Sequence, residues 1–187
     1  MKEISQETLN RAIGGDMEAF EAIYKATSGF VYNVALRITQ KPADAEDITQ
    51  EVFVKIYKSL KDFEFKSSFK TWVYRITVNA ALNHVRASKK DKDVVDVKDI
   101  NILADKRDEL KADIDREDSM AKVNSMLTLL NPDQRACIVL RELQGLDYKE
   151  IAQALDIPVN TVRTRLKRAR EALVSFARWG VESHEVR

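Results

Sequence analysis

Residues 146–170 read LDYKEIAQALDIPVNTVRTRLKRAR, and this stretch decides how the second half of the chain folds. Two apolar stripes at helical spacing run through it: Tyr148, Ile151, Ala152 and Leu155, then Val162, Leu166 and Ala169. Asp156-Ile157-Pro158 separates them, and Pro158 suits a helix start because its missing N–H is not needed there. The pattern predicts two short helices joined by a tight turn, a helix-turn-helix. We expect Asp156 to take the strained turn position, which Asp tolerates better than most residues.

The second helix of this motif is strongly cationic. Residues 161–170 hold five cations and no acid, although the whole chain has a net charge of only +1. At about 100° per residue the outward side chains are Asn160, Arg163, Thr164, Lys167 and Arg168. Arg165 and Arg170 lie nearer the apolar border, so we expect them to contact phosphates or to pair within the domain. In a helix-turn-helix the second helix enters the DNA major groove. A solvated basic face is the alternative.

A third helix is predicted just upstream, in LNPDQRACIVLRELQG at residues 130–145. Asn131 is a good cap, Pro132 sits in the first turn, and Gly145 ends the helix. Three helices of this kind make a small DNA-binding domain. Cys137 is the only cysteine, so the chain has no internal disulfide and no cysteine-based metal site. We interpret Cys137 as a small core residue.

The first half of the chain also reads as helices. In KPADAEDITQEVFVKIYKSL, residues 41–60, Pro42 and the acids after it suit a helix start. Its buried positions are Ile48, Val52, Ile56 and Leu60. Beside that stripe lie three polar residues, Asp47, Gln50 and Glu51. They form either a binding face or an ordinary polar surface.

A basic, aromatic region follows. Residues 55–90 contain nine Lys or Arg and two acids, and the segment DFEFKSSF at 62–69 adds aromatic rings. The next helix has a stripe predicted to face outward: Thr71, Arg75, Asn79, Leu82 and Arg86. Cationic surface with interleaved aromatic residues suits single-stranded nucleic acid, because bases stack and phosphates are neutralised. Phe69 and Trp72 are equally compatible with a core, and for Trp72 we favour the core.

The overall organisation follows from composition. The 187 residues include only five Gly and three Pro, which favours long helices over β-hairpins. Residues 88–118 have eleven acids against eight bases and no aromatic residue, which is typical of a solvated, flexible linker. We predict an all-α chain of two small helical domains, at 1–90 and 120–180, with a linker at 91–119 and a tail at 181–187. The N-terminus is too polar for a signal peptide and no stretch approaches a membrane span, so we expect a cytoplasmic protein without membrane insertion.

Three segments together carry a family resemblance. DAEDITQEVFVKIYKSLKDF at 44–63, SSFKTWVYRITVNAALNHVR at 67–86 and residues 130–173 closely resemble the bacterial sigma-70 family, in its small extracytoplasmic-function (ECF) class. The resemblance implies a sigma factor, not an enzyme. It would bind core RNA polymerase, recognise −35 and −10 promoter elements and promote DNA melting. The implied partners are the largest-subunit clamp coiled coil and the flap of polymerase, promoter DNA, and an anti-sigma factor. No cofactor and no metal are implied.

The resemblance also assigns roles to individual residues. Those matching the polymerase-binding helix are Asp47, Gln50 and Glu51. Those matching the −10 reading and melting surface are Lys55, Phe63, Lys66, Ser67, Arg75, Asn79 and Asn83. Those matching the −35 recognition helix are Asn160, Thr161, Arg163, Thr164, Lys167 and Arg168.

The chain departs from the family pattern at two places. Family members often carry Arg-Gly-acid in the −10 loop, where this chain has Glu64-Phe65-Lys66. We therefore expect an altered −10 preference. Asp156 replaces the common turn Gly, which we expect to affect stability more than DNA readout.

Two other classes of protein remain as alternatives. A helix-turn-helix regulator acting without polymerase would account for residues 132–176, but it leaves the 47–51 face and the basic aromatic region unexplained. An enzyme is disfavoured because the chain has no Gly-rich phosphate loop, and His84 and His184 have no motif context.

Overall fold

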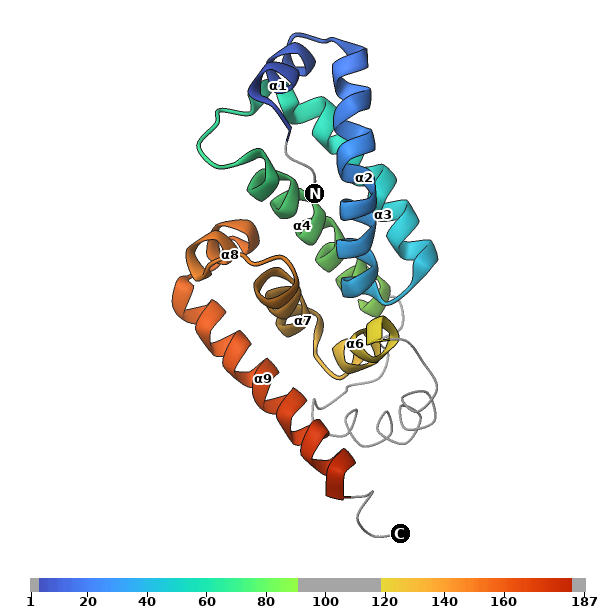
Figure 1. The fold of residues 1–187 in the computed structure, drawn as a ribbon, viewed down its shortest axis with the longest axis vertical. Coiled ribbons are helices and arrows are strands. Elements are labelled where there is room, and N and C mark those ends of the chain that lie inside the picture. Colours follow the sequence, from blue (N-terminus) through green and yellow to red (C-terminus); the bar gives the residue numbers. More distant parts are fainter. Residues whose placement is uncertain (1–3, 91–118, 183–187) are drawn as a thin grey trace.

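The computed structural model describes residues 4–90 and 119–182, and within those ranges it contains helices and turns but no strand. The first domain comprises α1 (Gln6–Ile13), α2 (Met17–Thr39), α3 (Pro42–Ser59), the 3₁₀ turn η1 (Leu60–Asp62) and α4 (Phe69–Lys90). The second comprises α6 (Ser119–Thr128), α7 (Pro132–Ile138), the π-helical segment η2 (Val139–Leu143), α8 (Tyr148–Leu155) and α9 (Val159–Glu182). Figure 1 shows the two groups of helices, which confirm the predicted all-α, two-domain architecture. The predicted linker falls outside the described residues, apart from Ser119, which begins α6.

The predicted helix starts are present with the expected caps. Pro42 is the first residue of α3. The Asn131 side chain accepts a hydrogen bond from the Gln134 backbone N–H (2.9 Å), and the Gln134 side chain accepts one in return, which forms a capping box. Asp147 and Glu150 form a second capping box at the start of α8. These caps satisfy amides that a helix N-terminus otherwise leaves unpaired.

The first domain closes around α2, α3 and α4, which pack on one another. Ile23, Ile38 and Ile56 are fully buried between them. Trp72 is 9% exposed and belongs to the core, as predicted. The outward stripe predicted on α4 needs two corrections, because Thr71 and Leu82 are buried.

The second domain holds the predicted helix-turn-helix. Val162 and Leu166 of α9 are fully buried, as is Cys137, and Asp156 ends α8 in the left-handed conformation with φ of 52°. The helix from Pro132 is less regular than predicted, because it widens into the π-helical segment η2 before Gln144 and Gly145. Gly145 has φ of 75°, a value that glycine adopts without steric cost.

Arg135 connects the two domains. It lies in α7 and is 8% exposed, and its guanidinium donates to the carbonyl oxygens of Leu127 (2.7 Å), Leu130 (2.9 Å) and Ile38 (2.7 Å). Ile38 belongs to the last turn of α2, so one arginine joins the end of a first-domain helix to the second domain. Burial lowers the pKa of Arg135 to about 10, so the side chain is still a cation at neutral pH.

Replacing Arg135 with Ala should destabilise the chain strongly. The change removes three hydrogen bonds from a buried cation, and we expect a loss of about 3 kcal/mol of unfolding free energy. Arg163→Ala, at an exposed position, is the control and should change stability by less than about 0.5 kcal/mol. Urea unfolding followed by circular dichroism measures both. Equal midpoints for the two variants would show that the buried hydrogen bonds contribute little.

Candidate functional site

The first candidate surface is the α3 face, defined by Asp47, Gln50 and Glu51. All three side chains are exposed on one side of α3, as predicted. Lys55 lies one turn further along, and its Nζ is 2.5 Å from Oε1 of Glu51. The structure therefore places Lys55 beside the α3 face, although the sequence grouped it with the basic aromatic region.

An apolar extension of the α3 face was not found from the sequence. Val54 and Tyr57 continue along α3 and are 53% and 55% exposed, and Tyr24 of α2 is 46% exposed. The Tyr57 ring contacts Phe20 of α2 edge to face, with centroids 5.1 Å apart. Large exposed apolar side chains beside charged ones are typical of a protein-binding surface. The sequence did contain a signal for this extension. Val54 and Tyr57 are apolar but do not fall on the helical stripe of buried residues, Ile48, Val52 and Ile56, so they could have been expected on the surface.

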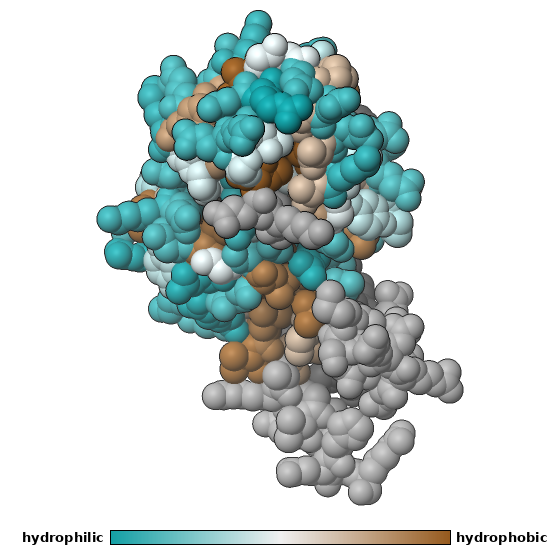
Figure 2. All heavy atoms as spheres, turned by 45° about the horizontal axis from the view of Figure 1, so that its top comes forward, coloured by the Kyte–Doolittle hydropathy of each residue, from teal (hydrophilic) through white to brown (hydrophobic). Residues whose placement is uncertain are grey.

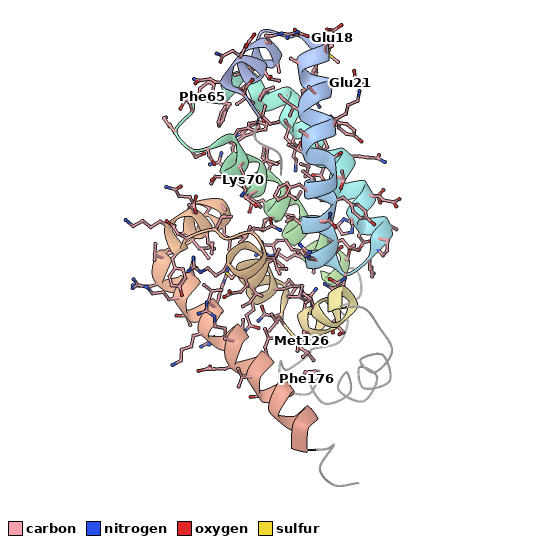
Figure 3. All side chains as sticks on the ribbon, in the orientation of Figure 1. Glu18, Glu21, Phe65, Lys70, Met126 and Phe176 are labelled. Atoms are coloured by element: carbon pink, nitrogen blue, oxygen red, sulfur yellow. The ribbon has the colours of Figure 1, made fainter. Side chains whose placement is uncertain are left out.

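The second candidate surface is the aromatic loop, residues 63–68, which connects η1 to α4. Figure 3 shows Phe65 on this loop at the side of the first domain and Lys70 near the start of α4. The sequence predicted Phe63 as the contact residue, but Phe63 is only 7% exposed. Its ring packs against Phe69 and Trp72, with centroids 5.8 and 5.2 Å away, so Phe63 is part of the core.

Phe65 is instead the exposed ring of the aromatic loop. It is 45% exposed and stands 4.8 Å from the Phe63 ring, centroid to centroid. Its φ is 56°, a value that is uncommon for any residue other than glycine and costs on the order of 1–2 kcal/mol. Lys66, in the next position, is exposed and forms an ion pair with Glu64, while Ser67 is half-buried.

The α4 stripe, defined by Arg75, Asn79 and Asn83, begins about two helical turns beyond the aromatic loop. Arg75 and Asn83 are exposed and Asn79 is half-buried. The three residues recur at four-residue spacing, which places them along one side of the helix. The loop and the stripe together form a polar strip of cations, amides and one exposed ring.

The third candidate surface is the α9 ridge. Its members are Asn160, Thr161, Arg163, Thr164, Lys167 and Arg168, all exposed except Thr161, which is half-buried. Arg163 donates to the Asn160 side chain (3.2 Å), and Lys167 is 3.8 Å from Glu171. Among the residues that the structure describes, Arg168 forms no ion pair.

The two border arginines pair within the domain, as one of our alternatives predicted. Arg165 is 3.3 Å from Asp133, and Arg170 donates to Glu142 at 2.7 Å. The Glu142 contact raises the pKa of Arg170. Their charges are thus neutralised internally, whereas the α9 ridge keeps its cations turned outward.

Other kinds of site have no counterpart in the described ranges. No group of three or more His, Cys, Asp or Glu gathers there in a way that would hold a metal ion. No helix within 4–90 or 119–182 is both long and apolar enough to cross a membrane. Figure 2 shows one face of the molecule, where hydrophilic residues cover most of the described surface. The described helices thus carry an outward cationic ridge on α9, a strip of cations, amides and one exposed ring on the aromatic loop and α4, and a separate acidic and apolar surface on α3.

Comparisons with known proteins identify the family. The family model Sigma-70 region 2 matches residues 23–91, and the model Sigma-70, region 4 matches residues 120–173. The RNA polymerase sigma-H factor of Pseudomonas aeruginosa is 33% identical over 179 residues, covering 92% of this chain and 93% of that protein. The ECF RNA polymerase sigma-E factor of Escherichia coli (strain K12) is 35% identical, covering 90% of this chain and 91% of that protein. The chain belongs to the sigma-70 family of transcription-initiation factors, in the ECF class.

Solved structures share the fold. CnrH, in complex with the cytosolic domain of CnrY, is similar with a TM-score of 0.67 at 23% identity, over 94% of this chain and 97% of CnrH. The sigma factor RpoE from Bartonella quintana, in complex with the anti-sigma factor NepR, has a TM-score of 0.65 at 23% identity, over 85% of this chain and 96% of that protein.

Proposed function

We propose that this ECF sigma factor binds core RNA polymerase through the α3 face and directs it to promoters by recognising −35 and −10 elements. The observation that carries the proposal is the separation of surfaces, with an acidic and apolar protein-binding face on α3 and outward cations on α9. The near-neutral net charge of +1 supports it, because the free chain lacks the excess charge for strong independent DNA binding. The proposed site of action is the cytoplasm.

The −35 element is read by the α9 ridge in this proposal. Arginine side chains bind guanine in the major groove with two hydrogen bonds, which discriminate among bases. Arg168 and Arg163 are the candidates, since both are exposed and project from the outward side of α9. Arg165 and Arg170 already pair with acids, so they hold the helix in position.

The −10 element is opened by the aromatic loop and the α4 stripe. Extruding one base from the duplex costs a few kcal/mol, which stacking and pocket contacts offset. Phe65 offers an exposed ring for stacking, Lys66 neutralises a phosphate, and Asn79 supplies hydrogen bonds to a base. Because these groups bind the open strand better than the duplex, they shift the equilibrium toward melting.

An anti-sigma factor is the further partner in this proposal. The support is the family membership and the fold shared with RpoE, which was solved with the anti-sigma factor NepR. The surface used for such a partner is not assigned.

In vitro transcription from a promoter library tests the function. Core RNA polymerase with this chain should start RNA from a subset of promoters on which core alone is silent. The joint substitution Asp47→Ala, Gln50→Ala and Glu51→Ala should abolish these transcripts and weaken core binding about tenfold or more, as expected when a few interface residues carry most of the binding energy.

The matched control for that variant is Glu7→Ala and Asn10→Ala, at exposed positions of α1 away from the α3 face. Circular dichroism should show the same helicity for both variants. Unchanged core binding by the triple variant would remove the α3 face from the proposal. Equal promoter binding by the chain with and without core polymerase would instead support the regulator alternative.

Phe65 should affect promoter opening more than promoter binding. Phe65→Leu keeps an apolar side chain but loses the stacking ring, so we expect the rate of open-complex formation to fall about tenfold, in line with 1–3 kcal/mol of stacking per base. Phe65→Tyr should stay close to the parent chain. Permanganate reactivity of −10 thymines measures promoter opening. Thermal unfolding of each variant distinguishes a folding defect from a defect in opening. Normal promoter opening with Phe65→Leu would show that Phe65 only packs against the Phe63 ring and does not stack on a base.

Arg168 and Arg170 should differ in their effect on sequence preference. Arg168→Ala should relax the preference at one −35 base pair by about 1–3 kcal/mol. Arg170→Ala breaks the pair with Glu142 and should leave the order of preferred sequences unchanged. Holoenzyme binding to single-base −35 variants at two salt concentrations distinguishes the roles. A uniform loss across all variants with Arg168→Ala, together with a salt slope lower by about one, would make Arg168 a phosphate contact.

A further inference from the structure

The aromatic loop carries three consecutive side chains that are all exposed: Glu64, Phe65 and Lys66. The Glu64 carboxylate and the Lys66 ammonium form an ion pair, so their head groups lie side by side although Phe65 separates the two residues in the chain. Figure 3 shows Phe65 on this loop, at the side of the first domain. The loop therefore presents an acid, an aromatic ring and a cation at three successive positions.

The core anchors this loop at both ends. Phe63 packs against Trp72 with ring centroids 5.2 Å apart, and Ser68 caps α4 by accepting a hydrogen bond from the Thr71 backbone N–H (3.0 Å). Between these anchors Phe65 has φ of 56° and packs against the Phe63 ring. A strained backbone conformation persists only where the surrounding contacts hold it, and such residues cluster at functional sites. The two anchors and the strained residue thus set the direction in which the acid and the cation point.

The paired head groups present hydrogen-bonding groups in a definite order. An ionised carboxylate has two acceptor oxygens and no donor, and an ammonium has three N–H donors and no acceptor. Side by side, Glu64 and Lys66 present acceptor, acceptor and donor. The Watson–Crick edge of cytosine presents the same order to guanine. The ion pair can persist during such a contact, because each carboxylate oxygen has a second lone pair and the ammonium keeps donors for a base oxygen and a phosphate.

Guanine is the base whose edge matches this order. Its 2-amino group and its N1–H donate to the two carboxylate oxygens, and its O6 accepts from the ammonium. Adenine and cytosine each offer the carboxylate one donor group, and thymine offers one N–H between two acceptors. A bidentate contact between a charged group and two parallel partners is both stronger and more selective than a single hydrogen bond. A purine also covers more of an aromatic ring than a pyrimidine does, so stacking on Phe65 favours the same choice.

We infer that Glu64 and Lys66 read the identity of a base, and that they make the aromatic loop select guanine at one unpaired position of the −10 element. This inference rests on the proposed function, to which it adds one base and the side chains that choose it. In the family pattern Arg-Gly-acid the cation precedes the acid, whereas in this chain the acid comes first. The inference therefore gives a direction to the altered −10 preference expected from the sequence.

Binding to fork-junction DNA tests the choice of base. Such DNA is double-stranded at the −35 element and carries the −10 nontemplate strand unpaired, so that binding does not require melting. At one unpaired position the holoenzyme should bind guanine about tenfold more tightly than thymine, as expected for one bidentate contact. The same preference for all four bases at every unpaired position would overturn the inference.

Two guanine analogues identify the edge of the base that is read. Inosine lacks the 2-amino group and should bind about fivefold more weakly than guanine, the loss expected for one hydrogen bond. The analogue 7-deazaguanine keeps the whole Watson–Crick edge and should bind like guanine. Weaker binding of 7-deazaguanine together with unchanged binding of inosine would place the contact on the other edge and overturn the inference.

Glu64→Gln tests the side chain that reads the base. Glutamine is similar in size but has one acceptor oxygen and no charge, so the ratio of guanine to inosine affinity should fall below about twofold. Asp62→Asn removes the same charge at an exposed position just before the loop, and should keep the parent ratio. Lys66→Met should weaken guanine and inosine equally, because both bases carry O6. A parent-like ratio in Glu64→Gln would overturn the assignment of Glu64.

The outcomes separate the two proposals. A parent holoenzyme that starts no RNA from any promoter removes the proposed function, and with it this inference. A holoenzyme that transcribes and opens promoters, but binds guanine no better than the other bases, leaves the proposed function intact and overturns the selection of guanine.

Discussion

The buried guanidinium of Arg135 is the contact on which the arrangement of this chain depends. Carbonyl groups in the last turn of a helix lack partners within the helix and carry partial negative charge. Arg135 meets such groups at the end of α2 and around the end of α6, through the oxygens of Ile38, Leu127 and Leu130. Burying a cation is costly unless it is fully hydrogen-bonded. Arg135 therefore needs all three carbonyl groups close to its guanidinium, and this requirement fixes the position of one domain relative to the other. The position of α7 then sets where Asp133 and Gln144 meet α4.

Different cationic side chains serve the fold and the proposed recognition of DNA. Arg135, Arg165 and Arg170 are satisfied by carbonyls or acids inside the molecule. The cations of the α9 ridge remain on the surface, where a polyanion can approach. The same division holds for aromatic rings, since Phe63 packs into the core while Phe65 stays exposed. This division explains how a chain of net charge +1 can present a strongly cationic helix.

Much of the fold follows from the sequence, because helix periodicity, Pro42, Asn131 and the Asp156 turn are local signals that tertiary structure did not override. The places where the sequence fell short all depend on contacts between distant residues. Thr71 and Leu82 are buried by packing that helical spacing alone does not reveal. Phe63 and Phe65 are two positions apart in a loop without periodicity, so only the backbone, with φ of 56° at Phe65, determines which ring is exposed. The hydrogen-bond partner of Tyr74 and one of the three carbonyl partners of Arg135 lie in the other domain, and no local pattern identifies them.

The central claim is that α3 engages polymerase while α4 and α9 engage two separate promoter elements. The most direct measurement is a cryo-electron-microscopy structure of core polymerase with this chain on a promoter recovered from the library. The account predicts that the α3 face contacts core polymerase in that complex, with the α4 stripe at the unpaired −10 strand and the α9 ridge in the −35 major groove. A complex active in transcription in which the α3 face makes no contact with polymerase, or the α9 ridge makes no contact with DNA, would contradict it.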